Sequence, residues 1–147
     1  MNIENKKVKN TVILVDDSSI DNFVNTKIIT RYQFADEVIL FTKSKKALAF
    51  MIGLNKVPEN EIPGILFLDL DMPEIDGFEF LDAFNILCDK VRKNMKIVIL
   101  TSSSNPADIE KCNKFDSVIA FFHKPLIKNN LETLEKLLSR TKRTPVF

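Results

Sequence analysis

Short apolar runs alternate with segments of helical periodicity along most of this 147-residue chain. Each run is only four or five residues long, which is typical of buried strands rather than helices. The expected strands are Thr11–Val15, Glu37–Phe41, Ile65–Leu68, Lys96–Leu100 and Val118–Phe122. This alternation predicts an α/β protein with a doubly wound, five-stranded parallel sheet and helices on both faces. The common strand order for such a sheet is 2-1-3-4-5.

Five helices are expected, one after each strand. The positions that predict them are Ile20, Phe23, Val24 and Ile28; residues 44–54; Phe80, Leu81, Phe84, Leu87 and Cys88; Asn105 and Pro106; and Ile127, Leu131, Leu134 and Leu138. Asn105 followed by Pro106 is typical of a helix start, because asparagine caps and proline suits the first helical position. The spacing from Ile127 to Leu138 places its four apolar residues on one helix face.

Composition indicates one globular domain, with 45% apolar and 28% charged residues. We expect the domain to span 11–139, between an N-terminal tail, 1–10, and a C-terminal tail, 140–147. The formal charge of +1 provides no broad positive field, so nucleic acid is not an expected partner. The sequence also lacks an apolar stretch of about 18 residues, which excludes a membrane span and favours the cytoplasm.

The two cysteines, Cys88 and Cys112, lack the spacing of a zinc or redox motif. A cytoplasmic location favours reduced thiols, and we expect both of them on helices.

Chemically reactive side chains follow four of the five expected strands. Asp16 and Asp17 follow the first strand, Asp69 the third, Thr101 the fourth and Lys124 comes shortly after the fifth. The carboxyl ends of parallel strands share one crevice, and ligands bind where the strand order reverses. In the expected order this point lies between the first and third strands, so three carboxylates should meet there.

Three crowded carboxylates repel one another, which raises at least one pKa unless a cation neutralises them. Mg²⁺ suits such oxygen ligands and commonly binds carboxylates together with a phosphate. Screening by this ion would let Asp69 attack a phosphoryl group, while Lys124 and Thr101 hold the remaining oxygens. The expected product is an aspartyl phosphate.

The motifs at these strand ends resemble one known family. They are the pair Asp16 and Asp17, the segment LFLDLDMPEIDGFEF at 66–80, Thr101 followed by Ser102, and Lys124 joined to Pro125. From about Thr11 to Leu138, the chain resembles a response regulator receiver domain, the phosphoacceptor half of two-component signalling. The resemblance implies a flavodoxin-like fold and a stand-alone, chemotaxis-regulator-like protein.

The family resemblance also implies roles for individual residues. Asp69 would accept the phosphoryl group, and Asp17 and Asp69 would ligate Mg²⁺ with the backbone carbonyl of Asp71, while Asp16 binds directly or through water. Lys124 would contact the phosphoryl oxygen, Thr101 would sense it, and Phe121 would be the aromatic switch. Asp71 and Ser103 occupy variable positions that tune the lifetime of the phosphorylated state.

The expected partners follow from a single histidine, His123. Strand alternation points its side chain away from that of Lys124, so a surface or supporting role is expected. The phosphoryl donor would then be a separate histidine kinase or histidine phosphotransfer protein. Output would pass to another protein through the fourth helix, fifth strand and fifth helix, by docking or by onward relay. The chain would catalyse only its own phosphorylation and dephosphorylation.

Two alternative functions remain open. Asp69, Leu70 and Asp71 spell the DxD motif of haloacid dehalogenase-like magnesium phosphatases. That family places its nucleophile near the start and its acidic pair last, whereas the acidic pair comes first here, and Pro73 replaces the usual threonine or valine. The other alternative is a receiver-shaped interaction module that binds partners without phosphorylation.

Overall fold

The sheet has the predicted parallel topology. The computed structural model describes residues 11–142, and the side chains of residues 11–139. Its five strands lie in the order β2-β1-β3-β4-β5, and every neighbouring pair is parallel. They are β1 (Thr11–Val15), β2 (Glu37–Phe41), β3 (Ile65–Leu68), β4 (Lys96–Thr101) and β5 (Val118–His123). Only β4 and β5 differ from the prediction, each being one residue longer.

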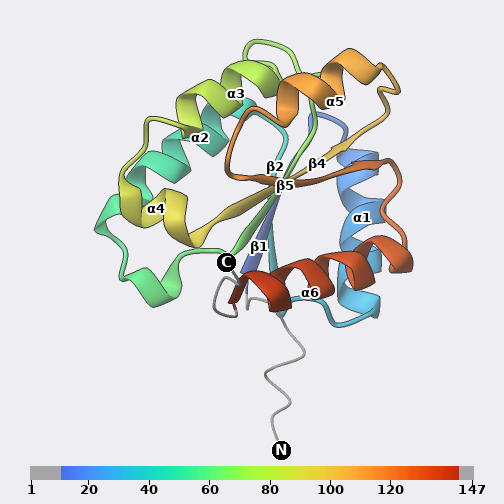
Figure 1. Cartoon of the computed structure of the whole chain (residues 1–147), viewed down its shortest axis with the longest axis horizontal. Coiled ribbons are helices and arrows are strands. Elements are labelled where there is room, and N and C mark those ends of the chain that lie inside the picture. Colours follow the sequence, from blue (N-terminus) through green and yellow to red (C-terminus); the bar gives the residue numbers. More distant parts are fainter. Residues whose placement is uncertain (1–10, 143–147) are drawn as a thin grey trace, which may run out of the picture.

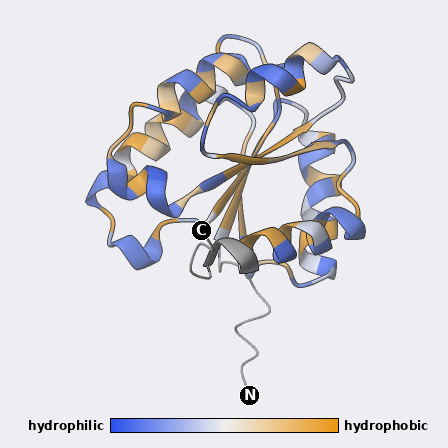
Figure 2. Cartoon of the chain, in the orientation of Figure 1, coloured by the Kyte–Doolittle hydropathy of each residue, from blue (hydrophilic) through white to orange (hydrophobic). Residues whose placement is uncertain are grey.

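Helices cover both faces of the sheet (Figure 1). They are α1 (Ser19–Arg31), α2 (Ser44–Gly53), α3 (Gly77–Phe84), α4 (Asp89–Asn94), α5 (Pro106–Cys112) and α6 (Lys128–Lys142), with 3₁₀ turns at Leu54–Lys56 and Glu59–Glu61. Buried residues of α1 and α6 share one hydrophobic core, and those of α2 to α5 share the other. Figure 2 shows the hydrophobic strands between these two layers. None of the described helices is long and apolar enough to cross a membrane.

Helix α1 is present, but the apolar stripe that predicted it is not its buried face. Ile20 is 73% exposed and Phe23 is 60% exposed, whereas Asn22, Asn25 and Ile29 are buried. The amide of Asn22 donates to the carbonyl of Asp16 at 3.0 Å, and Asn25 Oδ1 accepts the Leu126 N–H at 3.0 Å. These amides satisfy backbone groups at the end of β1 and in the loop after β5, where an apolar side chain would leave them unpaired.

The segment after β3 forms two helices where one was predicted. Helix α3 ends at Phe84, so Leu87 and Cys88 lie beyond it, and the described chain has six α-helices where five were expected. The Leu87 carbonyl accepts a hydrogen bond from Arg92 Nε at 2.8 Å, which satisfies it outside a helix. Cys88 is therefore an exposed N-cap residue of α4, and only Cys112 lies within a helix.

The last helix differs from the prediction at both ends. Leu131, Leu134 and Leu138 are buried as expected, but Ile127 precedes α6 and is 49% exposed. The helix continues to Lys142, so residues 140–142 of the predicted C-terminal tail are helical. The predicted N-terminal tail, 1–10, and residues 143–147 lie outside the described residues.

Candidate functional site

Strand register brings the acidic residues of β1 and β3 together. Val15 pairs with Leu68, so Asp16 and Asp69 follow directly opposed positions. The sheet hydrogen bonds continue into both residues, because the Asp69 N–H donates to the Val15 carbonyl at 3.0 Å and the Asp16 N–H donates to the Phe41 carbonyl at 3.1 Å. The backbone of each aspartate is therefore held by a neighbouring strand.

Asp16, Asp17 and Asp69 form the predicted acidic cluster. One carboxylate oxygen from each lies within 4.8 Å of the other two. Asp16 and Asp69 are each only 4% exposed, while Asp17 is exposed and gives the cluster an open side. Hard carboxylate oxygens at this spacing suit Mg²⁺, which keeps several of its waters when it binds. Among the described residues, these three side chains could hold such an ion.

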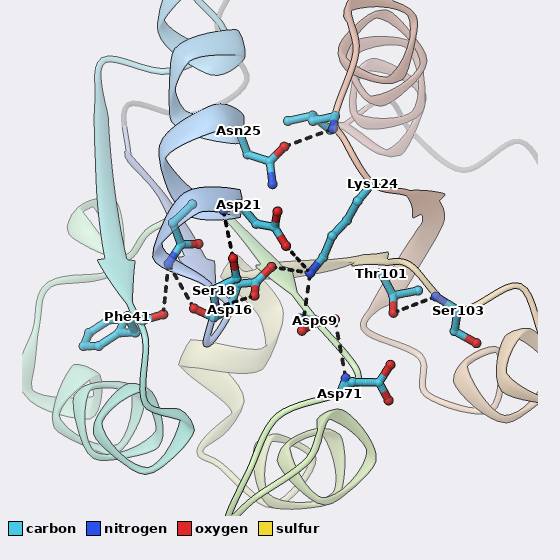
Figure 3. Close-up of polar contacts among 12 residues, drawn as sticks. Asp16, Ser18, Asp21, Asn25, Phe41, Asp69, Asp71, Thr101, Ser103 and Lys124 are labelled. Atoms are coloured by element: carbon cyan, nitrogen blue, oxygen red, sulfur yellow. Dashed lines mark hydrogen bonds and ion pairs between the residues drawn. The ribbon is translucent and has the colours of Figure 1, made fainter.

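Lys124 is the positive centre of the site (Figure 3). Its Nζ lies 2.6 Å from Asp16 Oδ2, 2.9 Å from Asp21 Oδ2 and 3.5 Å from Asp69 Oδ2. The Lys124 N–H donates to the Thr101 carbonyl at 2.9 Å, which anchors the lysine beside the end of β4. The peptide bond between Lys124 and Pro125 is cis. The structure thus brings together the predicted acids and the predicted lysine.

Asp21 was not among the predicted site residues. It occupies the first turn of α1, where its N–H donates to the N-cap Ser18 Oγ at 3.1 Å. In the sequence, Ser18 followed three residues later by an acid is typical of a helix start. Only the packing of α1 against the loop after β5 reveals the contact between Asp21 and Lys124.

Burial and charge shift the pKa values of this cluster. Burial, followed by the charge of Asp16, raises the pKa of Asp69 from 3.8 to about 6. Burial also raises the pKa of Asp16, and the hydrogen bond from Lys124 opposes this change only in part. For Lys124, burial lowers the pKa, but hydrogen bonds to Asp16 and Asp21 outweigh it and place the pKa above its usual range. The site therefore pairs a firmly protonated lysine with acids that are costly to ionise.

Thr101 ends β4 and is fully buried. Its hydroxyl oxygen accepts the Ser103 N–H at 3.3 Å. Ser103 Oγ donates in turn to Asp108 Oδ2 at 2.6 Å, which ties the loop after β4 to the first turn of α5. Asp108 is a second contact that sequence reasoning missed. In the sequence, Asp108 has only the pattern of an ordinary acidic residue near a helix start.

Phe121 lies on β5, half-buried against the core on the α5 side of the sheet. Its ring meets that of His123 edge to face, with centroids 6.3 Å apart. His123 is exposed, as predicted for a surface histidine. The predicted switching role of Phe121 concerns a change of state and stays a prediction.

The loop after Asp69 is held by a close backbone approach. The Asp71 N–H donates to Asp69 Oδ1 at 3.4 Å, and the Asp71 side chain is exposed. Further along, the Gly77 N–H donates to the Leu70 carbonyl at 2.9 Å. A Cβ at Gly77 would lie 2.6 Å from Leu70 Cα and 2.8 Å from the Asp69 carbonyl oxygen, so only glycine fits there.

Comparisons with known proteins agree with this architecture. The family model described as "Response regulator receiver domain" matches residues 12–136. A two-component response regulator from Cytophaga hutchinsonii has a similar crystal structure, with a TM-score of 0.81, 30% identity, and coverage of 88% of this chain and 96% of that one. A receiver protein from Dyadobacter fermentans gives a TM-score of 0.77 and 27% identity, over 91% of this chain and 98% of that one.

Curated relatives include longer proteins. The two-component response regulator ORR1 of indica rice is 29% identical over 127 residues, which cover 85% of this chain and 53% of the rice protein. The response regulator Rcp1 of a Synechocystis strain is 28% identical over 98 residues, or 67% of this chain and 65% of Rcp1. The chain thus spans about half the length of the rice relative. On the family match and the shared fold, the chain belongs to the response regulator receiver domains of two-component signalling.

Proposed function

We propose that the chain accepts a phosphoryl group on Asp69 from the phosphohistidine of a histidine kinase or histidine phosphotransfer protein. The observation that supports this most strongly is the environment of Asp69. Its carboxylate is buried, lies within 4.8 Å of oxygens of two other acids and is 3.5 Å from Lys124 Nζ. Such a carboxylate is well placed for phosphoryl transfer once added positive charge offsets the repulsion between the acids.

In the proposed reaction, a carboxylate oxygen of Asp69 attacks phosphorus while the bond from phosphorus to the donor imidazole nitrogen breaks. The imidazole leaves with the electron pair of that bond and takes up a proton. Lys124 and the Thr101 hydroxyl hold phosphoryl oxygens. Mg²⁺, when bound, neutralises charge between the acids and the phosphoryl group. Its proposed ligands are Asp17, Asp69 and the backbone carbonyl of Asp71, with Asp16 binding directly or through water.

Loss of the phosphoryl group to water would be tuned by Asp71 and Ser103, which lie two residues beyond Asp69 and Thr101. The Asp71 N–H donates to Asp69 Oδ1, and the exposed Asp71 carboxylate adds negative charge to the same loop, where it would act on an approaching water. The only enzymatic activity in this proposal is the chain's own phosphorylation and dephosphorylation.

The proposed output is a two-state change. Phosphorylation would draw the Thr101 hydroxyl towards Asp69 and break its contact with the Ser103 N–H, which now measures 3.3 Å. Phe121 would then move inward. The surface of α5, β5 and α6, which are the predicted fourth helix, fifth strand and fifth helix, would change. A protein target would bind this surface, or the phosphoryl group would pass onward in a relay. We place these events in the cytoplasm, where ATP for the donor kinase is available.

The phosphoacceptor assignment is tested by incubation with acetyl phosphate and Mg²⁺, followed by intact-mass analysis. We expect one phosphoryl group on the wild-type chain and none on Asp69→Asn. Asp82→Asn, which alters an exposed acid on α3 outside the site, should still be labelled. Equal labelling of wild type and Asp69→Asn would discard the assignment.

The switch requires a separate test, because a receiver-shaped module could bind partners without phosphorylation. Beryllium fluoride with Mg²⁺ mimics the phosphoryl group, and we expect amide resonances at Thr101 and Phe121 to move when it binds. If those resonances do not change although Asp69 is labelled, the proposed switch is wrong and the phosphoacceptor assignment still stands. The phosphatase alternative is not favoured, since the family match is to receiver domains, and turnover of small phosphate esters would be needed to revive it.

A further inference from the structure

Lys124 is shared by three carboxylates, and one of them lies outside the acidic cluster. Asp16, Asp69 and Asp21 all contact its Nζ, at 2.6, 3.5 and 2.9 Å. The cluster of potential metal ligands contains Asp16 and Asp69 together with Asp17, but not Asp21. Figure 3 shows Asp21 reaching Nζ from α1, on a different side from Asp69. Asp21 is therefore a partner for the lysine that a metal would not need.

Asp16 has two competing tasks in this arrangement. Its Oδ1 accepts the Ser18 N–H at 2.9 Å, and its Oδ2 contacts Lys124 Nζ at 2.6 Å. Both oxygens are thus engaged before any cation binds. A divalent cation among the acids would also lie near the ammonium, and like charges at that range in a partly buried site repel strongly. Binding of the cation therefore favours movement of Lys124 away from Asp16.

The carboxylate of Asp21 has no capping task that would compete with Lys124. In α3, Glu79 closes a capping box by accepting the Asp76 N–H at 2.9 Å. In α1, the corresponding donor is the Ser18 N–H, and it is bonded to Asp16 instead. The Asp21 side chain is 39% exposed, so it can follow the lysine without disturbing the core.

We propose that Asp21 is a positioning residue that holds the Lys124 ammonium when a divalent cation binds Asp16 and the lysine moves away from it. The inference rests on the proposed function and adds a residue to it. Lys124 then stays beside Asp69, ready for a phosphoryl oxygen, and Asp16 becomes available to the cation. Without Asp21, the lysine keeps only Asp16 and Asp69 as acidic partners among the described side chains, and both are needed by the metal.

The proposal is tested by titrating purified protein with magnesium chloride and following the amide resonances of Asp69 and Asp71. We expect Asp21→Asn to weaken Mg²⁺ binding about fivefold to tenfold, within the range of coupled neighbouring groups. Asp21→Glu should restore affinity to within about twofold, because it keeps the carboxylate. Asp82→Asn, on the exposed surface of α3, removes the same charge as a control and should have little effect.

A double-mutant cycle separates positioning from simple attraction between Asp21 and the cation. In a Lys124→Met background, we expect Asp21→Asn to change Mg²⁺ affinity less than about twofold. An equal loss in both backgrounds would overturn the proposal, while labelling of Asp69 would still support the proposed function. A wild-type protein that binds no Mg²⁺ would overturn both.

A second measurement covers the case in which the Lys124→Met variants do not fold. The Nζ proton resonances of Lys124 report whether the ammonium is held or exchanges with water. In the presence of Mg²⁺ they should stay visible in the wild type and broaden in Asp21→Asn. Equal visibility in both proteins would also overturn the proposal.

Discussion

Replacing Asp69 by asparagine should stabilise the protein near neutral pH when no metal is present. The pKa of Asp69 is raised from 3.8 to about 6, chiefly by burial and then by the charge of Asp16. At about 1.4 kcal/mol per pKa unit, ionised Asp69 costs the folded state about 3 kcal/mol at pH 7. Asparagine has nearly the same shape and no charge, so we expect a gain of about 1–3 kcal/mol.

The sign of the pH dependence follows from the same shift. Between about pH 4 and pH 6 the folded state binds more protons at Asp69 than the unfolded state does. The contribution of Asp69 to stability is therefore present below the unfolded pKa and is lost as the pH rises through the folded one. The stability difference between Asp69→Asn and wild type should be small near pH 4 and reach its full size near pH 7.

The assay is urea unfolding followed by circular dichroism, in EDTA, at several pH values from 4 to 7.5. The difference between the two proteins cancels most other titrating groups. Added Mg²⁺ should narrow the difference at pH 7, because it stabilises the folded wild type more than the variant. An asparagine variant that is less stable at pH 7, or a difference that does not change with pH, would refute the reasoning.

Three further substitutions test features of the fold. Gly77→Ala would place a Cβ 2.6 Å from Leu70 Cα and 2.8 Å from the Asp69 carbonyl oxygen, and we expect it to cost about 1–3 kcal/mol in urea unfolding; wild-type stability would show that the loop can shift at no cost. Ile29→Ala should cost about 2–5 kcal/mol because Ile29 is fully buried, whereas Phe23→Ser should change stability by less than about 0.5 kcal/mol because Phe23 is 60% exposed. A large loss from Phe23→Ser would mean that the apolar stripe of α1 is buried after all.

The predictions from sequence succeeded where a local signal and a global rule agreed. A short apolar run ending in Asp69 marks both a strand and its carboxyl end, and parallel topology then brings Asp16 and Asp69 together. Residues 105 and 106 likewise mark the start of α5 by chemistry that acts within one turn. Such signals depend on few residues and survive tertiary packing.

The predictions failed where distant contacts decided the outcome. Helix α1 buries Asn22 and Asn25 because strand ends and the loop after β5 present unpaired backbone groups to them. The spacing of apolar residues in α1 does not indicate that these two asparagines are buried. The role of Asp21 was missed for the same reason, since its partner Lys124 lies 103 residues further along the chain. The break between α3 and α4 is a local exception: α3 ends at Phe84, and Arg92, only five residues further on, satisfies the Leu87 carbonyl outside a helix.

The most direct test of the proposed chemistry is a crystal structure of the protein grown with Mg²⁺ and beryllium fluoride. We expect one cation about 2.1 Å from oxygens of Asp17, Asp69 and the Asp71 backbone. Beryllium fluoride should be attached to Asp69, and Lys124 should contact one of its fluorine atoms. A structure in which the same acids surround no cation, or in which beryllium fluoride binds elsewhere, would contradict the assignment of Asp69 as the phosphoryl acceptor.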